Sequence, residues 1–282
     1  MSTLLRDRRA VWGGTLLGVM LLAAILAPIV APLDPAAQPD VAGTRFVPPL
    51  SADRHGIYHP LGTDRFGRDV WARLVYGARV SLSVSALAVL VSVVVGVGIG
   101  AVAGFGTGIV STALIGATDF ALALPRAVLL LLLASLWPPS AGLVVVVLGL
   151  TGWMPIARLV HGEVRAVSAR PYVESAMALG ARSSTVLWRH VVPNALTPVA
   201  VAAALAVGNA ITLEAGLSFL GLGVQPPAAS WGNMIASGRD TLVNAPWVAA
   251  APGVAIALAV VACTLLGDAL NDALRPAGQG AG

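Results

Sequence analysis

The residues that could do chemistry in this chain are few, and their types exclude several kinds of enzyme. The 282-residue sequence holds 17 basic residues, all of them arginine, and no lysine. A phosphate-binding P-loop needs a lysine on the terminal phosphates, and Schiff-base chemistry needs a lysine amine. We therefore expect no ATPase site and no bound cofactor in this chain. The single cysteine, Cys263, cannot form an intrachain disulfide and is expected to be a packing residue.

Two pairs of polar residues have spacings that could suggest a site. His55 and His59 are four residues apart, but a metal site needs further ligands, so we expect no bound metal. Asp64 and Asp69 could be an acid–base pair, yet both have arginine neighbours that would keep them ionised. No H-E-x-x-H motif occurs in the sequence. An intramembrane enzyme, and any catalytic residue, is therefore disfavoured.

Three further charged residues lie within apolar runs. Glu214 stands where an unpaired charge costs several kcal/mol, so it must be paired or wetted. We expect Glu214 near the outer end of a membrane span, facing the protein interior either at an outer gate or beside a structural partner. Asp119 and Arg126 are seven residues apart and would share one face of a continuous helix. That face is expected toward the cytoplasmic end or toward the other helices.

The elements that position these residues are predicted to be membrane helices. Hydrophobic residues make up 57% of the chain and charged residues 11%, against roughly 25% charged in soluble proteins. Lipid must therefore be the solvent for much of the surface. A span needs about 20 mostly apolar residues, which predicts an all-α fold with about six transmembrane helices. The expected spans are residues 11–30, 80–103, 112–136, 141–160, 195–222 and 247–267.

These spans divide the chain into four parts. Residues 1–33 hold a basic start and the first span, and residues 34–79 form an extracytoplasmic loop. Charged and apolar residues alternate around Asp64–Trp71, which predicts an amphipathic helix lying at the outer interface. Residues 80–268 form a core of five spans with a cytoplasmic loop at 161–194, and residues 269–282 form a tail. Arginines favour a cytoplasmic location for both termini and for this loop, although the 34–79 segment carries six arginines of its own.

The longest polar interval of the second half predicts a helix–turn–helix. Pro171 suits a first helical turn, and Glu174 is favourable near that N-terminus. Gly180 is a natural C-terminal stop, and small residues around it would let a partner surface approach closely.

A second short helix is expected beyond Gly180. Ser183 or Ser184 could cap it, and it would run to about His190. The Pro193–Asn194 pair is then expected to turn the chain back toward the membrane. An ordinary amphipathic loop is the alternative interpretation of the interval.

This segment resembles the cytoplasmic "EAA" loop of type I ABC importer permeases. The residues expected to form the ATPase-coupling loop are Tyr172, Glu174, Ser175, Ala178, Leu179, Gly180, Ala181, His190, Pro193 and Asn194. In that family the loop supplies a coupling helix that docks in a groove of the ATPase subunit. The resemblance implies the type I permease fold, with half of the translocation pathway in this chain.

Three other segments narrow the resemblance to the second permease subunit of dipeptide, oligopeptide and nickel importers. They are HPLGTDRFGRDVWARLVYGARVSL, LEAGLSFLGLGVQPPAASWGNMI and LLGDALNDALRP, at residues 59–82, 213–235 and 265–276. The resemblance implies a heterodimer with a related permease, two cytoplasmic ABC ATPase subunits or domains that bind ATP and Mg²⁺, and an extracytoplasmic solute-binding protein. It also implies the bacterial inner membrane, with lipid around the helices.

Peptides are the cargo that the resemblance favours, and nickel or another small solute is the alternative. An ion-coupled secondary transporter is a more distant alternative. Such carriers tend to have intramembrane acids and inverted repeats, and this sequence has few of the former and no convincing repeat. The arginines are scattered, so a nucleic-acid partner is not expected.

Overall fold

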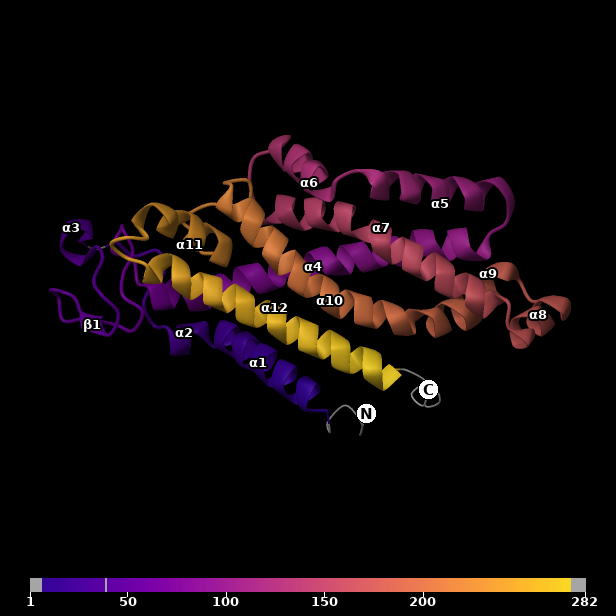
Figure 1. The fold of residues 1–282 in the computed structure, drawn as a ribbon, viewed down its shortest axis with the longest axis horizontal. Helices are drawn as coiled ribbons and strands as arrows, with labels where there is room; N and C mark the ends of the chain where they lie inside the picture. The colour runs from indigo at the N-terminus through magenta and orange to yellow at the C-terminus, as the bar shows by residue number, and fades with distance from the viewer. Residues whose placement is uncertain (1–6, 39, 275–282) are drawn as a thin grey trace.

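A computed structural model describes residues 7–38 and 40–274, which form an elongated bundle of helices (Figure 1). Within these residues, five helices are long and apolar enough to cross a membrane, and a sixth span results if the bent pair α5–α6 is counted as one. The all-α prediction with about six spans is therefore confirmed. The long elements are α1 (Arg8–Ile25), α4 (Val70–Phe105), α5 (Gly108–Ala123), α6 (Arg126–Ser135), α7 (Ala141–Ser168), α10 (Val192–Phe219) and α12 (Trp247–Leu274). The short elements are α2 (Ala27–Val30), α3 (Val41–Thr44), β1 (Ser51–Ala52), β2 (Tyr58–His59), α8 (Pro171–Ala178), α9 (Ser183–Val186), a π-helix (Leu187–Val191), α11 (Trp231–Gly238) and a 3₁₀ turn (Arg239–Thr241).

The longest helix, α4, begins ten residues earlier than predicted. Its 36 residues rise about 54 Å, well beyond the roughly 30 Å of the hydrocarbon layer. Asp69 starts the helix, because its carboxylate accepts a hydrogen bond from the Ala72 backbone N–H at 2.6 Å. Residues 70–79, which include Arg73 and Arg79, extend the helix beyond the predicted span, and all of them except Arg79 are buried or half-buried in the protein.

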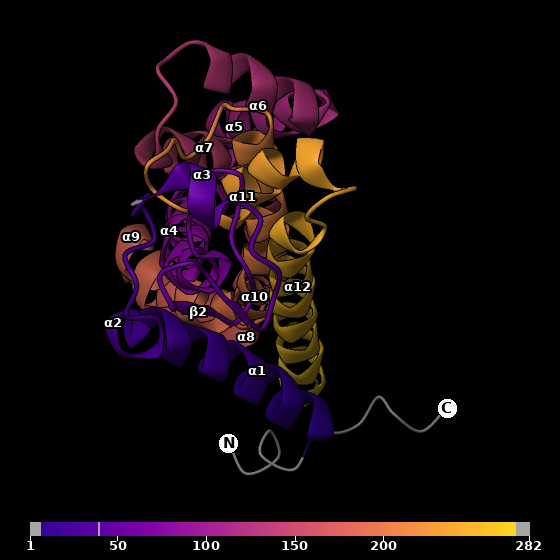
Figure 2. The ribbon, with the colours of Figure 1, turned by 90° about the vertical axis from the view of Figure 1, so that its left-hand side faces the viewer.

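A view along the bundle places α4 in the middle, with α1, α7, α10 and α12 around it (Figure 2). The closest pairing is with α7, and glycines at every fourth position make it possible. A Cβ added to Gly96 would lie 2.8 Å from Ile156, and one added to Gly104 would lie 2.7 Å from the His161 carbonyl oxygen. Gly100 between them meets the Ala157 carbonyl in the same way. Small residues thus let the two helix backbones touch, as in other membrane helix pairs.

The third span is broken rather than continuous, which corrects the prediction of one helix over 112–136. Helices α5 and α6 meet at an angle of 88°. Leu124 ends α5 in an extended conformation because Pro125 follows it, and the residue before a proline disfavours helical angles. Asp119 and Arg126 therefore do not share a helix face. Asp119 instead lies 3.0 Å from Arg158 of α7.

The predicted interfacial helix around residues 64–71 is wrong. Residues 62–69 form tight turns, with positive φ at Gly62 and Gly67. The charged side chains pair inside the loop: Arg68 Nε donates to Asp64 at 2.7 Å, and both residues are buried. Arg73 of α4 lies 3.9 Å from the same carboxylate. Opposite charges a few residues apart in sequence thus neutralise one another within the protein instead of facing the membrane surface.

The two histidines of this outer loop have different carboxylate partners. His55 Nε2 lies 3.5 Å from Asp40. His59 Nδ1 lies 2.7 Å from Asp69, and its Nε2 lies 3.5 Å from Asp53. Burial acts to raise the pKa of Asp53, but hydrogen bonds from the Ile57 and His55 backbone N–H groups and from His59 lower it overall. The histidines therefore belong to a folded loop at the N-terminal end of α4.

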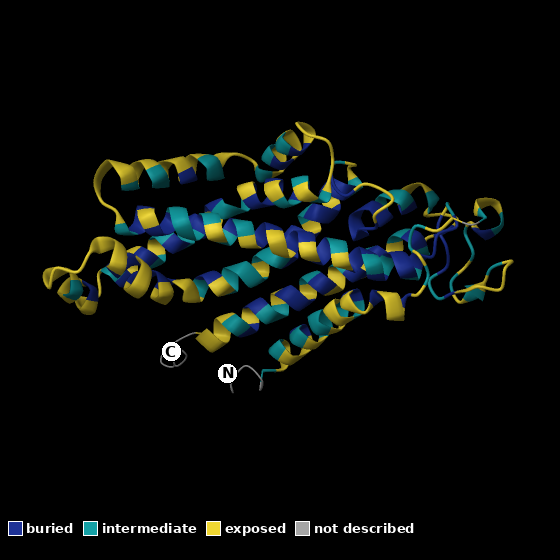
Figure 3. Cartoon of the chain, turned by 180° about the vertical axis from the view of Figure 1, so that it is seen from behind, coloured by how far each residue is buried: buried dark blue, intermediate teal, exposed yellow. Residues whose placement is uncertain are grey.

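Exposed residues run along the outer faces of α1 and α5 (Figure 3). Thr118 is the single buried residue of α5, while Ile109 and Phe120 are 88% and 71% exposed. Such apolar surface needs lipid or another chain to cover it. The described ends of α1 and α12 lie side by side, joined by an Arg9–Asp272 ion pair of 3.3 Å. The predicted tail begins as the end of α12, and its residues 275–282 lie outside the described part of the chain.

Candidate functional site: the 170–194 segment

The segment that links α7 to α10 projects from one end of the bundle, opposite the end that carries α3 and β1 (Figure 1). Helix α8 has Pro171 in its first turn and Glu174 one turn from its start, as the residue types predict. The side chains of Glu174 and Ala178 are four residues apart on one exposed face. The Ser175 hydroxyl donates to the Pro171 carbonyl at 2.8 Å and so stays within the helix.

Gly180 ends α8 as predicted. Its φ is +81°, and its N–H donates to the Met177 carbonyl at 3.0 Å. The Ala181 N–H donates to the Ala176 carbonyl at 3.1 Å, which completes a Schellman motif. A residue other than glycine would be strained at this φ. The turn leaves Leu179 89% exposed at the tip of the molecule.

The second short helix exists, but neither Ser183 nor Ser184 caps it. Arg182 is the N-cap, with no side-chain hydrogen bond to the helix. After α9 the chain passes through the π-helix and enters α10 without a turn, so the predicted reversal at Pro193–Asn194 is wrong. Pro193, which has no N–H to donate, follows directly on the π-helix, where the regular α-helical hydrogen-bond pattern is already interrupted. The Asn194 amide donates back to the His190 carbonyl at 2.6 Å.

All ten of the predicted coupling residues are exposed in this segment. The exposed members are Tyr172, Glu174, Ser175, Ala178, Leu179, Gly180, Ala181, His190, Pro193 and Asn194. The first seven lie on α8 and its turn, and the last three lie on the π-helix and the start of α10. The surface thus combines small residues, one exposed leucine and one carboxylate.

Sequence reasoning missed the residues that hold this surface in place. Val173 and Val186 are buried in one apolar cluster with Val164 and Val167 of α7. The cluster continues into the π-helix through Leu187 and Val191. The signal was available in the sequence: Val173 is a β-branched apolar residue beside Glu174 and Ser175, and Val186 and Leu187 follow the serines. Val173 thus packs α8 into the same apolar cluster that holds residues of α7, the π-helix and the start of α10.

Glu214 lies far from this surface, near the C-terminal end of α10. It is fully buried, and its carboxylate accepts hydrogen bonds of 2.8 Å from Ser81 of α4 and 2.8 Å from Ser218. The Ser81 hydroxyl in turn accepts from the Trp231 backbone N–H at the start of α11. Glu214 thus joins α4, α10 and α11 at the end of the bundle opposite α8.

These features define a membrane permease whose exposed helical hairpin is anchored on two spans, and comparison with known proteins agrees. Residues 96–277 match the family described as binding-protein-dependent transport system inner membrane component. Residues 1–49 match the N-terminal TM domain of oligopeptide transport permease C. The chain belongs to the first of these families and is a type I ABC importer permease of the oligopeptide permease C kind.

Similar proteins cover most of the chain. A "probable peptide ABC transporter permease protein" of Sinorhizobium fredii is 44% identical over 76% of this chain and 74% of its own length. A "putative peptide permease protein" of Brucella suis is 38% identical over 96% of this chain and 88% of its own. Among solved structures, an inward-facing form of the MetNI methionine ABC transporter gives a TM-score of 0.60 at 18% identity, covering 72% of this chain and 97% of that one. That likeness shows a shared fold.

Proposed function

We propose that this chain forms half of the translocation pathway of an ABC importer for peptides. The relatives named as peptide permeases support the cargo, since one of them matches the chain almost end to end. The family assignment replaces the ion-coupled transporter as an explanation. In this proposal the chain catalyses no covalent step. Its partners are a related permease subunit, two ABC ATPase subunits that bind ATP and Mg²⁺, and an extracytoplasmic solute-binding protein.

The observation that carries the proposal is the exposed hairpin of α8 and its turn. A lone hairpin fixed by buried valines to two spans is suited to transmit a rigid-body movement. We propose that Glu174, Ala178 and Leu179 contact the ATPase and that the segment faces the cytoplasm. The described ends of α1 and α12 then lie toward the cytoplasmic side, in the inner membrane. Residues 161–194 would form the coupling part, and residues 34–69 would meet the binding protein outside.

The test is co-purification of the ATPase subunits in mild detergent. A variant with Glu174→Arg and Gly180→Pro should lose the ATPase, because the first change reverses a charge on the surface and proline cannot adopt the positive φ of Gly180. Asp240→Arg is the matched control, since it reverses an exposed charge after α11. The related permease should stay bound in all three proteins. Retention of the ATPase by the double variant, or its absence from the unaltered protein, would overturn the assignment.

A further inference from the structure

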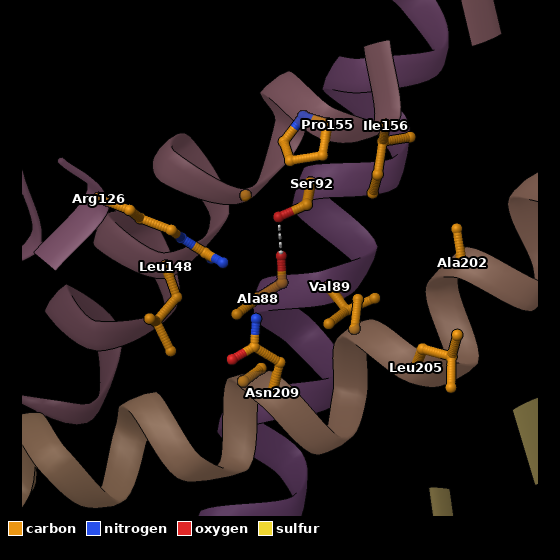
Figure 4. A pocket seen from close by; sticks show the side chains of 13 residues that line it. Ala88, Val89, Ser92, Arg126, Leu148, Pro155, Ile156, Ala202, Leu205 and Asn209 are labelled. Atoms are coloured by element: carbon orange, nitrogen blue, oxygen red, sulfur yellow. Dashed lines mark hydrogen bonds between the residues drawn. The ribbon is translucent and has the colours of Figure 1, made fainter. Parts of the chain in front are cut away.

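A cavity of about 250 Å³ lies between α4, α7 and α10, about halfway along the bundle (Figure 4). Ala88 and Ser92 line it from the middle of α4, and Gly152 lines it from the middle of α7. Its walls are otherwise mostly aliphatic. Complete small-molecule sites usually measure about 300–1,000 Å³, so this space is sized for one end of a ligand.

Two hydrogen-bond donors extend into this space. Figure 4 shows the guanidinium of Arg126 and the amide of Asn209 directed into it from different elements. Arg126 reaches the cavity because the break between α5 and α6 places it at the first turn of α6. Gly152 leaves room beside it: a Cβ there would come within 3.3 Å of Arg126 Nη2.

The charge of Arg126 has no counter-ion within the described residues 7–38 and 40–274. No carboxylate in that part of the chain lies within ion-pair distance of it, and its buried Nε has no hydrogen-bond partner there. The nearest acid in sequence, Asp119, is engaged with Arg158. An arginine inside a membrane bundle is costly unless paired, and such residues mark substrate pathways. Planar guanidinium groups bind carboxylates through two parallel hydrogen bonds.

We propose that this cavity receives the terminal carboxylate of a peptide during translocation, with Arg126 as its counter-ion and Asn209 as a second donor. The inference rests on the proposed function, since the peptide supplies the carboxylate. A lipid headgroup is a poorer occupant, because the lining residues lie near the middle of α4, α7 and α10 rather than near the ends of these helices. Discontinuous helices at mid-depth are also where other transporters place charged substrate groups.

The experiment compares uptake of a dipeptide with uptake of its C-terminal amide by the importer in proteoliposomes, with its ATPases, partner permease and binding protein. Arg126→Gln should slow uptake of the free-carboxylate peptide on the order of tenfold and leave the amide unchanged. Arg126→Lys should restore part of the loss, because the charge remains but the paired geometry does not. Arg9→Gln is the control, since it removes an exposed arginine charge at the edge of the bundle.

Several results would overturn the inference. Equal uptake by Arg126→Gln and the unaltered chain would overturn it while leaving the proposed function intact. An equal loss for both peptides, or loss of the partner permease on purification, would show that Arg126 serves folding or pairs with an acid of the partner. Failure of the unaltered importer to take up either peptide would overturn the proposed function and this inference together.

A second measurement does not depend on transport. Ala206 lines the same cavity, so Ala206→Cys in a Cys263→Ala background offers one thiol for a charged reagent. In the assembled importer the dipeptide should slow labelling and its amide should not. Adding Arg126→Gln should remove that protection. Equal protection by the two peptides would contradict the carboxylate site.

Discussion

Glu214 illustrates how the fold accommodates a charged residue within an apolar helix. Each of its two carboxylate oxygens accepts a hydrogen bond from a serine hydroxyl. The hydrogen-bond network extends to the start of α11, because the Trp231 backbone N–H donates to one of these serines. Such a network is costly to leave half satisfied. The geometry supports a role in holding α4, α10 and α11 together at the outer end. Whether that junction also gates the pathway stays a prediction.

Replacing Glu214 tests this role. Glu214→Ala should lower the free energy of unfolding by about 1–3 kcal/mol, because two buried hydroxyls lose their acceptor. Thermal unfolding of the purified protein in detergent measures the change, with Ser83→Ala as an exposed control on α4. Glu214→Gln keeps the shape, so normal assembly together with normal uptake in that variant would remove the gating hypothesis.

The outer loop should be sensitive to acid through Asp53. Its pKa lies below the ordinary value of 3.8, so the ionised form stabilises the fold. That stabilisation is complete above about pH 4 and is lost as the pH falls through the lower folded-state pKa. Asp53→Asn should therefore unfold at a lower temperature at neutral pH and lose less stability between about pH 4 and pH 3. Asp240→Asn, a substitution of an exposed carboxylate, is the control and should leave the dependence of stability on pH unchanged. If stability fell with pH in Asp53→Asn as steeply as in the unaltered protein, Asp53 would not be the source of the acid sensitivity.

The elements show where sequence reasoning succeeds and where it stops. The existence of the spans followed from apolar length, and the start and stop of α8 followed from Pro171 and Gly180. The N-cap of α9 could not be predicted in this way, because a serine near the start of a helix caps that helix only if the backbone places the serine at the N-cap position. The break at Pro125 was visible in sequence, yet proline inside an apolar run occurs in unbroken membrane helices too, including Pro155 in α7.

The glycine row of α4 yields a prediction at this scale. Gly100→Leu should separate α4 from α7, because its side chain would occupy the space of the Ala157 backbone. We expect a clear loss of folded protein, measured as the monodisperse fraction on size-exclusion chromatography. Gly98→Leu is the matched control on the same helix, since nothing lies within 4 Å of its added Cβ. Similar losses in both variants would show that helix propensity, rather than packing, governs the effect.

At the scale of the whole molecule, four separated segments were enough to recognise the family. The packing contacts between the helices could not be predicted from the sequence. The buried links between α8 and the spans depend on which side chains face α7, and spacing alone did not fix that. The cavity at Arg126 could not be predicted either. A continuous helix would place Arg126 on the same face as Asp119, and it is the 88° bend between α5 and α6 that separates the two residues. Which residues distant in sequence come together thus depends on breaks in the helices, and the angle at each break is set by packing.

If the 170–194 segment docks on the ATPase as proposed, its exposed residues would serve docking and its buried residues would serve transmission of the movement. Leu179 is exposed at the tip, whereas Val173 is buried against α7 and the π-helix. Leu179→Asp should therefore weaken ATPase co-purification. Val173→Ala should retain the ATPase but lower peptide uptake per ATP hydrolysed several-fold, because a cavity under α8 lets the helix move without carrying α7 and α10. Ser83→Ala, which changes an exposed hydroxyl on α4 outside this segment, should alter neither quantity. The opposite result would contradict this assignment. If Val173→Ala lost the ATPase and Leu179→Asp lowered only the uptake per ATP hydrolysed, the Val173 side of α8 would be the side that contacts the ATPase.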